Sequence, residues 1–150
     1  MTAISTPSTP GTASHTLRYD QVQVGDALPA FETPPLSRLT LALYCGASGD
    51  HNPIHVDIDF ARGAGQKDVF AHGMLSAAWL GRVLTDWVPQ TAIRAYSVRF
   101  AAITQVGERI RCAGTVVEKR DDLRQVRVEL STRNQNGQVK LTGEAWLALP

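Results

Sequence analysis

The fold of this chain is decided by residues 73–88, which read GMLSAAWLGRVLTDWV. Ten of these sixteen residues are apolar, and the stretch contains no proline until Pro89 follows it. Placed on a helix, the apolar side chains circle nearly the whole surface instead of lining one stripe. Such a helix is stable when it is buried on most sides. The stretch therefore predicts a long buried helix over Gly73 to Val88.

The sequence after this helix is typical of strands. β-Branched and aromatic residues recur in four segments, with turn residues such as Gly107 and Asp121-Asp122 between them. The segments are Ile93–Phe100, Arg109–Glu118, Gln125–Thr132 and Val139–Leu149. Asn134–Gly137 is a good hairpin signal. We therefore expect an α+β fold in which a long helix packs on an antiparallel meander of about four strands.

The sequence before the helix begins with a segment that cannot form a core. Residues 1–15 are mostly Ser, Thr, Pro, Ala and Gly, so buried apolar surface cannot offset their ordering entropy. We expect a disordered tail over residues 1–15 and a single folded domain over residues 16–150. A length of 150 residues fits one domain.

Short elements connect the tail with the central helix. Val22–Val24 alternates in strand fashion, and Leu28–Thr33 is expected to form a first strand. Ser37 can cap a helix that runs to about Ala47. A short helical turn is expected at Asp57–Arg62.

Composition excludes several classes of function. The apolar fraction is 43%, the charged fraction is 19% and the net charge is +1, which are ordinary values for a folded globular protein. No broad basic field exists that would attract nucleic acid or an anionic membrane. We therefore expect no nucleic-acid partner and no membrane partner.

The expected cellular location depends on whether the sequence contains a membrane span or a secretory signal. Its apolar runs are too short to span a membrane, and its N-terminus has neither the basic start nor the apolar core of a secretory signal. Cys45 and Cys112 have no CxxC spacing and are interpreted as reduced, buried residues, with a single disulfide as the alternative. A cytoplasmic protein is expected.

A loop with two titratable side chains precedes the central helix. Residues 48–53 (Ser-Gly-Asp-His-Asn-Pro) are turn formers, and His55 follows Asp50 by five residues. A carboxylate can accept a proton from water, and an imidazole can donate or accept one near neutral pH. The pair could hold one water molecule and move its protons, while Asn52 orders the loop. The alternative is turn chemistry alone, with His55 as a packing residue.

Ala71-His72-Gly73-Met74 stands where the central helix begins. A helix N-terminus presents free N–H groups and partial positive charge, and Gly73 allows a ligand to approach the backbone. An N–H here could hold a thioester oxygen as it gains enolate charge, which is typically worth ~3–4 kcal/mol in the transition state. The alternative is that Gly73 only begins a helix.

No metal site is expected. His51 and His55 have i,i+4 spacing, but such residues share a face only on a helix, and Pro53 disfavours a helix there. The other donors that the sequence offers form no familiar zinc spacing. These donors are Asp50, Asp57, His72 and His15.

Several motifs together resemble one known family. Residues 44–57, YCGASGDHNPIHVD, contain the pattern Asp-x-Asn-Pro-x-His. Further matches are Phe60-Ala61, Ala71–Ser76, Val98–Phe100 and Gly143–Ala145. The combination closely resembles the MaoC-like dehydratases, or (R)-specific enoyl-CoA hydratases, over nearly the whole chain after about residue 18.

This resemblance implies a hotdog fold, in which an antiparallel sheet wraps a long central helix. It implies reversible hydration of a trans-2-enoyl thioester to an (R)-3-hydroxyacyl thioester, carried on CoA or acyl carrier protein, without a cofactor. Asp50 and His55 match the catalytic pair, and Gly73 matches the residue that binds the thioester oxygen. Asn52 and His72 match supporting positions. The family's usual unit is a dimer, so a homodimer is expected, with a heterodimer as the alternative.

Two other functions compete with this interpretation. Hotdog domains include thioesterases, many of which carry an acidic catalytic residue on the central helix, but here no carboxylate precedes Asp86. A non-catalytic subunit of a heterodimer is the second alternative, and the intact Asp50–His55 pair argues against it. Candidates for binding CoA phosphates, with solvated surface charges as the alternative, are Arg94, Arg99, Arg109 and Arg111.

Overall fold

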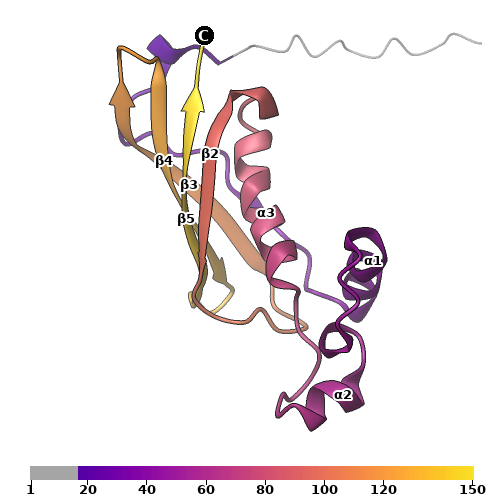
Figure 1. The fold of residues 1–150 in the computed structure, drawn as a ribbon. Coiled ribbons are helices and arrows are strands. Elements are labelled where there is room, and N and C mark those ends of the chain that lie inside the picture. Colours follow the sequence, from indigo (N-terminus) through magenta and orange to yellow (C-terminus); the bar gives the residue numbers. More distant parts are fainter. Residues whose placement is uncertain (1–16) are drawn as a thin grey trace, which may run out of the picture.

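The computed structural model describes residues 17–150 as one sheet, a long helix against it and a smaller helical group at one end (Figure 1). The tail predicted over residues 1–15 lies outside the described residues. The elements in chain order are η1 (Tyr19–Gln21), β1 (Phe31–Glu32), α1 (Arg38–Ser48), η2 (Pro53–His55), α2 (Ile58–Gly63), α3 (Gly73–Thr85), η3 (Gln90–Ala92), β2 (Ile93–Phe100), β3 (Ile110–Arg120), β4 (Gln125–Asn134) and β5 (Val139–Ala148).

The five strands form one antiparallel sheet in the order β1-β3-β4-β5-β2. Strands β3, β4 and β5 form the predicted meander, but β2 pairs with β5 instead of β3, so the prediction of a simple four-strand meander was wrong. Gly143 on β5 provides a physical reason why β2 can pair with β5. It lies opposite Val98 on β2. A Cβ at Gly143 would lie 2.5 Å from the carbonyl oxygen of Ser97, so β2 can approach only a glycine here.

The N-terminal segment contributes less strand than predicted. β1 covers only Phe31–Glu32 of the expected Leu28–Thr33, because Pro29 has no N–H to donate to a longer ladder. Val22–Val24 forms no strand. A turn bends the chain there, in which the N–H of Asp26 donates to the carbonyl of Gln23 at 3.1 Å.

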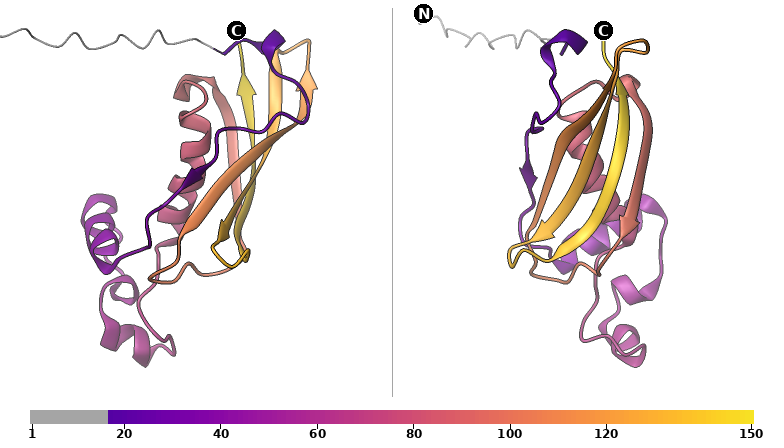
Figure 2. Two further views of the ribbon diagram at one scale, coloured as in Figure 1. Left: turned by 180° about the vertical axis from the view of Figure 1, so that it is seen from behind. Right: turned by 90° about the vertical axis from the view of Figure 1, so that its left-hand side faces the viewer.

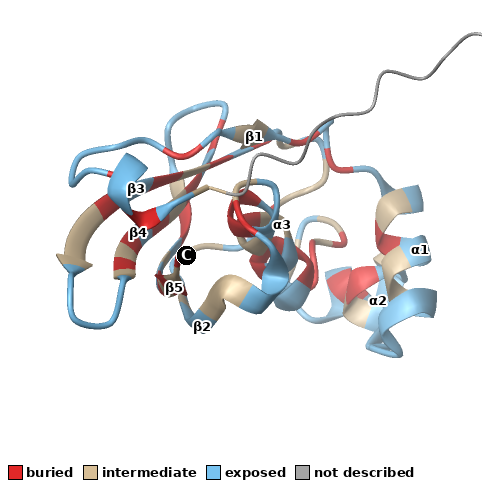
Figure 3. Ribbon diagram, turned by 90° about the horizontal axis from the view of Figure 1, so that it is seen from above, coloured by how far each residue is buried: buried red, intermediate tan, exposed pale blue. Residues whose placement is uncertain are grey.

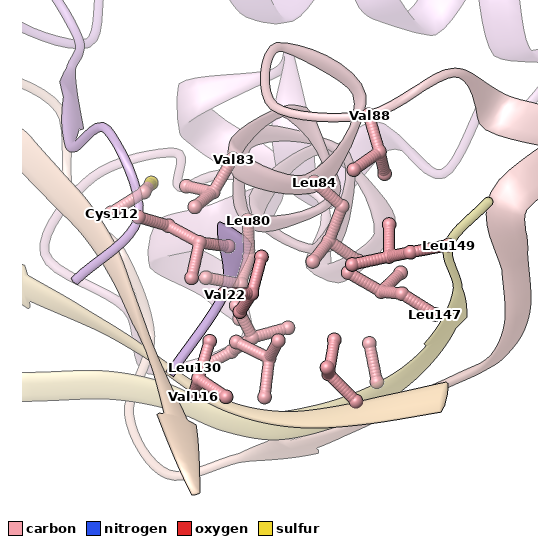
Figure 4. Close-up of a cluster of buried hydrophobic side chains, with 14 of the residues drawn as sticks. Val22, Leu80, Val83, Leu84, Val88, Cys112, Val116, Leu130, Leu147 and Leu149 are labelled. Atoms are coloured by element: carbon pink, nitrogen blue, oxygen red, sulfur yellow. The ribbon is translucent and has the colours of Figure 1, made fainter. Parts of the chain in front are cut away.

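The long helix α3 packs one face against the sheet. Its buried residues are Leu75, Ser76, Ala77, Leu80, Val83 and Leu84. They meet inward side chains of the strands, such as Val116, Leu130 and Leu147, in the main core (Figure 4). The opposite face is largely exposed in the single chain (Figure 3). Met74, for example, is 62% exposed. The helix is therefore less completely buried than its composition predicted, and it ends at Thr85, three residues before Val88.

The helices α1, η2 and α2 lie beyond the N-terminal end of α3 (Figure 2). Ser37 caps α1 as predicted, because its Oγ accepts the N–H of Thr40 at 3.0 Å. A second apolar cluster joins this group to the start of α3. Its buried members are Leu36, Leu41, Ala61, Val69, Ala71 and Leu75. This packing holds the loop after α1 against the first turn of α3.

The predictions about membrane-spanning segments and about the two cysteines can be compared with the structure of residues 17–150. Within residues 17–150, no helix is both long and apolar enough to cross a lipid bilayer. Cys45 and Cys112 are free thiols, as predicted, and burial raises the pKa of Cys112 to about 12. The prediction that both are buried was wrong for Cys45, which is half-buried near the exposed end of α1.

Candidate active site

The loop between α1 and η2 is ordered by its own side chains. α1 ends at Gly49, whose φ of 75° lies in the left-handed region that glycine adopts without strain. The carboxylate of Asp50 accepts the N–H of Asn52 at 3.3 Å, and Oδ1 of Asn52 accepts the N–H of Ile54 at 3.1 Å. These successive turns leave the Asp50 side chain exposed and bring His55 inward.

His55 is fixed by one backbone acceptor. Its side chain is 8% exposed, and its Nδ1 lies 2.8 Å from the carbonyl oxygen of Phe70. A carbonyl oxygen only accepts, so Nδ1 carries the proton and the lone pair of a neutral ring lies on Nε2. The ring of Phe70 packs edge-on at 5.1 Å between ring centroids. His55 can therefore act as a base through Nε2 while Nδ1 anchors the ring.

His72 connects the loop with the start of α3. It is completely buried, and its Nε2 lies 3.2 Å from the carbonyl oxygen of Asp50, so Nε2 donates that hydrogen bond. Its ring stacks on the ring of His55, with centroids 3.9 Å apart and planes 28° apart. Its Nδ1 has no hydrogen-bond partner within residues 17–150.

Burial keeps His72 neutral. Desolvation lowers its pKa, and repulsion from His55 lowers that pKa further. A protonated ring would also need an acceptor for a second N–H, and Nδ1 has none. Because His72 stays neutral, its stacked ring does not oppose a positive charge on His55.

Three of the predicted residues converge on one point. An oxygen of Asp50 and one ring nitrogen each of His55 and His72 all lie within 4.8 Å of one another, which makes the only such cluster among residues 17–150. The distances between these oxygen and nitrogen atoms would by themselves suit a metal ion. However, the stacked rings direct their nitrogen lone pairs along nearly parallel planes, so the two rings fit a shared ion poorly.

Other predicted donors lie outside this cluster. His51 is exposed, and the carboxylate of Asp57 caps α2 by accepting the N–H groups of Asp59 and Phe60. His15 lies outside the described residues.

Gly73 begins α3 beside the cluster. As the first helical residue, it has an N–H that the helix's own hydrogen bonds cannot use, and the His72 side chain makes no cap bond. A cavity of about 350 Å³ opens at this helix end. Its lining is mainly apolar and consists of Phe70, Ala71, Gly73, Ser76, Phe100, Ala101, Ala102, Ile103, Thr104 and Leu141.

Sequence reasoning missed the segment that closes this cavity. Residues 101–104 lie between two strands, and no motif marks them. They reach the site because the N–H of Ala71 donates to the carbonyl of Thr104 at 2.9 Å and Phe70 pairs with Gln105. The Thr104 hydroxyl is buried and has no hydrogen-bond partner in the part of the chain that the structure describes. A buried unpaired hydroxyl beside a cavity was not detectable from the sequence.

Comparison with known proteins places the chain in a family. A family model described as a MaoC-like domain matches residues 21–138. The chain belongs to the MaoC-like family. This MaoC-like protein is 31% identical over 132 residues to a mitochondrial 3-hydroxyacyl-[acyl-carrier-protein] dehydratase of Arabidopsis thaliana, which covers 86% of this chain and 78% of the relative.

Two further relatives extend the likeness. An (R)-specific enoyl-CoA hydratase of Rhodospirillum rubrum is 30% identical over 134 residues, covering 88% of this chain and 91% of the relative. The solved structure of R-hydratase PhaJ1 from Pseudomonas aeruginosa, in its unliganded form, matches with a TM-score of 0.79 at 27% identity and covers 90% of this MaoC-like chain and 86% of its own. The predicted hotdog fold, with α3 as its central helix, is thereby confirmed.

Proposed function

We propose that this MaoC-like protein catalyses the reversible hydration of trans-2-enoyl thioesters to (R)-3-hydroxyacyl thioesters. The observation that carries the proposal is the meeting of Asp50 and His55 with the free N–H end of α3, next to a mainly apolar cavity. The names of the Arabidopsis and Rhodospirillum relatives support the same reaction. Catalytic roles for these residues are part of the proposal.

In the proposed reaction, Asp50 and His55 hold one water molecule between them. His55 accepts a proton from this water through Nε2, while the Asp50 carboxylate orients it, and the water oxygen bonds to C3 of the enoyl group. Electrons of the C2–C3 double bond move toward the thioester oxygen, which the Gly73 N–H stabilises. His55 then returns the proton to C2, so one molecule of water is added in total.

Asn52 and His72 act in this proposal as positioning residues. Asn52 holds the turn between Asp50 and His55 through its bond to the Ile54 N–H. His72 holds the Asp50 backbone through Nε2 and supports the His55 ring by stacking. Neither residue needs to contact the substrate.

Replacing His72 by phenylalanine should lower kcat about five- to tenfold, because the aromatic stack survives but one buried hydrogen bond to Asp50 is lost. We expect KM for crotonyl-CoA to change little. Glutamine, whose amide N–H can reach the same carbonyl, should restore part of kcat. Unchanged kcat in the phenylalanine variant would contradict the positioning role.

A direct assay separates hydration from thioester hydrolysis. The purified protein should hydrate crotonyl-CoA, measured as the loss of enoyl absorbance, without releasing the free thiol of CoA. Thiol release would favour a thioesterase instead. The only carboxylate at the far end of α3, Asp86, lies 3.5 Å from Arg82 in an ion pair and caps the helix end remote from Gly73.

A dimer would complete the fold at its open edge. β2 is an edge strand, and most of its residues are exposed, including Tyr96 and Phe100. An unpaired edge of this length favours pairing with another chain. We propose a homodimer joined along β2, which sedimentation of the purified protein would test. Activity that appears only after a different chain is added would favour the heterodimer.

The names of the relatives bear on the compartment and on the carrier of the acyl group. A cytoplasmic location remains our proposal, although the Arabidopsis relative is named as mitochondrial. The two relatives are named for different carriers, acyl carrier protein and CoA. Acyl thioesters of either carrier are therefore proposed substrates.

A further inference from the structure

Three arginines share a cavity at one end of the sheet, on the face turned away from α3. The cavity has a volume of about 320 Å³. It is lined by Glu32, Arg109, Arg111, Arg133, Asn134, Gln135 and Gly137. Arg109 and Arg111 were candidates from the sequence, whereas Arg133 was not. The other two candidates, Arg94 and Arg99, lie on β2 and do not line it.

Of the described residues, Glu32 is the one carboxylate that lines this arginine cavity, and it stands opposite Arg111 on β3, so three arginines face a single acidic residue and the lining keeps a net positive charge. Arg111 on β3 stands directly opposite Arg133 on β4, and like charges at such positions destabilise a sheet. Among residues 17–150, no carboxylate oxygen lies within 4.0 Å of the side-chain nitrogens of these arginines. Arginines that do have such a partner are Arg38, Arg82, Arg120, Arg124 and Arg127. The arrangement suits an anionic ligand.

Polar contacts connect the lining of the arginine cavity with the lining of the cavity at Gly73. Asn134 lines the arginine cavity, and its Nδ2 donates to Glu108 at 2.7 Å. Glu108 pairs with Lys140 at 2.8 Å, and Nζ of Lys140 donates to the carbonyl of Ile103 at 2.8 Å. Ile103 lines the cavity at Gly73. Three consecutive side-chain contacts therefore separate the two cavities, at the end of the sheet where α3 begins.

We propose that the arginine cavity binds the phosphate groups at the nucleotide end of an acyl-CoA whose thioester reaches Gly73. This inference rests on the proposed function. Guanidinium groups form paired, charge-assisted hydrogen bonds with phosphate oxygens. The pantetheine arm would cross the connection of residues 101–109, which borders both cavities. Repulsion between Arg111 and Arg133 would be relieved when the phosphates bind.

The rest of this sheet face favours a small anion over an acidic protein. Further along the same face, Glu129 and Glu144 stand opposite each other on β4 and β5 and line a hollow together with Arg99. Both carboxylates are exposed, and Arg127 pairs with each of them. An acidic carrier protein spread over this face would meet these exposed carboxylates. A nucleotide confined to the arginine cavity would not.

The test compares substrates with and without the nucleotide in a variant that combines Arg111→Ser and Arg133→Ser. We expect KM for crotonyl-CoA to rise at least about tenfold, because charged hydrogen bonds to phosphate are lost, while kcat stays close to the unsubstituted value. KM for crotonyl-N-acetylcysteamine, which has no phosphate, should not change. The control is Arg120→Ser, which removes one positive charge at the opposite end of β3.

A binding measurement makes the test independent of turnover. Free coenzyme A should bind the unsubstituted protein in calorimetry, and the double variant should bind it at least about tenfold more weakly, with the Arg120 variant unaffected. Equal CoA affinity in all three proteins would overturn the proposal whether or not the protein hydrates crotonyl-CoA. A loss of rate with crotonyl-acyl carrier protein alone would also overturn it, in favour of carrier-protein docking.

Discussion

Replacing either Asp50 or His55 by asparagine is expected to lower kcat for hydration of crotonyl-CoA by about 10²–10⁴-fold. Asparagine at position 50 keeps the shape of the side chain and an oxygen for the Asn52 N–H but lacks the charge that orients water. Asparagine at position 55 can still donate to the carbonyl of Phe70, yet it has no group in the place of Nε2. Each change therefore removes one chemical function and leaves the local fold intact.

The double variant distinguishes a shared water molecule from two independent effects. If Asp50 and His55 hold the same water, the double variant should be little slower than the slower single variant, because such groups act as a unit. Circular dichroism and the melting temperature should match those of the unsubstituted protein. Near-full activity in both single variants would rule out the proposed mechanism.

The largest expected effect on stability comes from Lys140→Met. Lys140 is 2% exposed, and its ammonium group pairs with Glu108 and donates to the carbonyl of Ile103. Removing one partner of a buried ion pair leaves the other charge uncompensated, which costs about 3–5 kcal/mol. We expect a fall in melting temperature of roughly 10 °C, measured by calorimetry.

Combining Lys140→Met with Glu108→Leu should recover much of this loss. With both charges gone, no desolvated charge remains, and apolar side chains can pack in their place. If the double variant were as unstable as Lys140→Met alone, the loss would come from packing of the Lys140 side chain and not from the stranded Glu108 charge.

The ion pair also predicts how stability changes with pH. Burial works to raise the pKa of Glu108, but hydrogen bonds from Lys140, Asn134 and the Gln105 N–H outweigh it, so the pKa lies below its ordinary value. The unfolded chain therefore binds a proton first as pH falls. The stabilisation from Glu108 is present above the ordinary glutamate pKa and is lost as pH falls through the lowered folded value. Glu108→Gln should flatten this part of the acid-unfolding curve.

The sequence predicted those parts of the molecule whose signals are local. The apolar density of residues 73–88 predicted the central helix, and turn residues around Asn134–Gly137 predicted the β4–β5 hairpin. Ser37 predicted the start of α1. The motif from Asp50 to His55, together with Gly73, predicted where to look for chemistry, since both matched one family. Each of these signals depends on neighbours within a few residues.

Contacts between distant segments were not predictable in this way. The position of β2 beside β5 depends on Gly143, which allows the Ser97 backbone to come close. The support that His72 gives to Asp50 and His55 depends on packing of α1 and α2 against the start of α3. The pairing of Arg111 with Arg133 exists only in the register of β3 with β4.

The sequence by itself therefore determined the central helix, the class of fold and the catalytic candidates. Hydrophobic periodicity, turn formers and motifs all depend on residues that are close together in the sequence. Only the tertiary structure decided the strand order and the position of the neutral His72 against Asp50 and His55. It also decided that residues 101–104 line the cavity at Gly73 and that Arg111 lies opposite Arg133. These features join residues far apart in the chain. Their free energy depends on burial and charge in the folded state, which no short stretch of sequence contains.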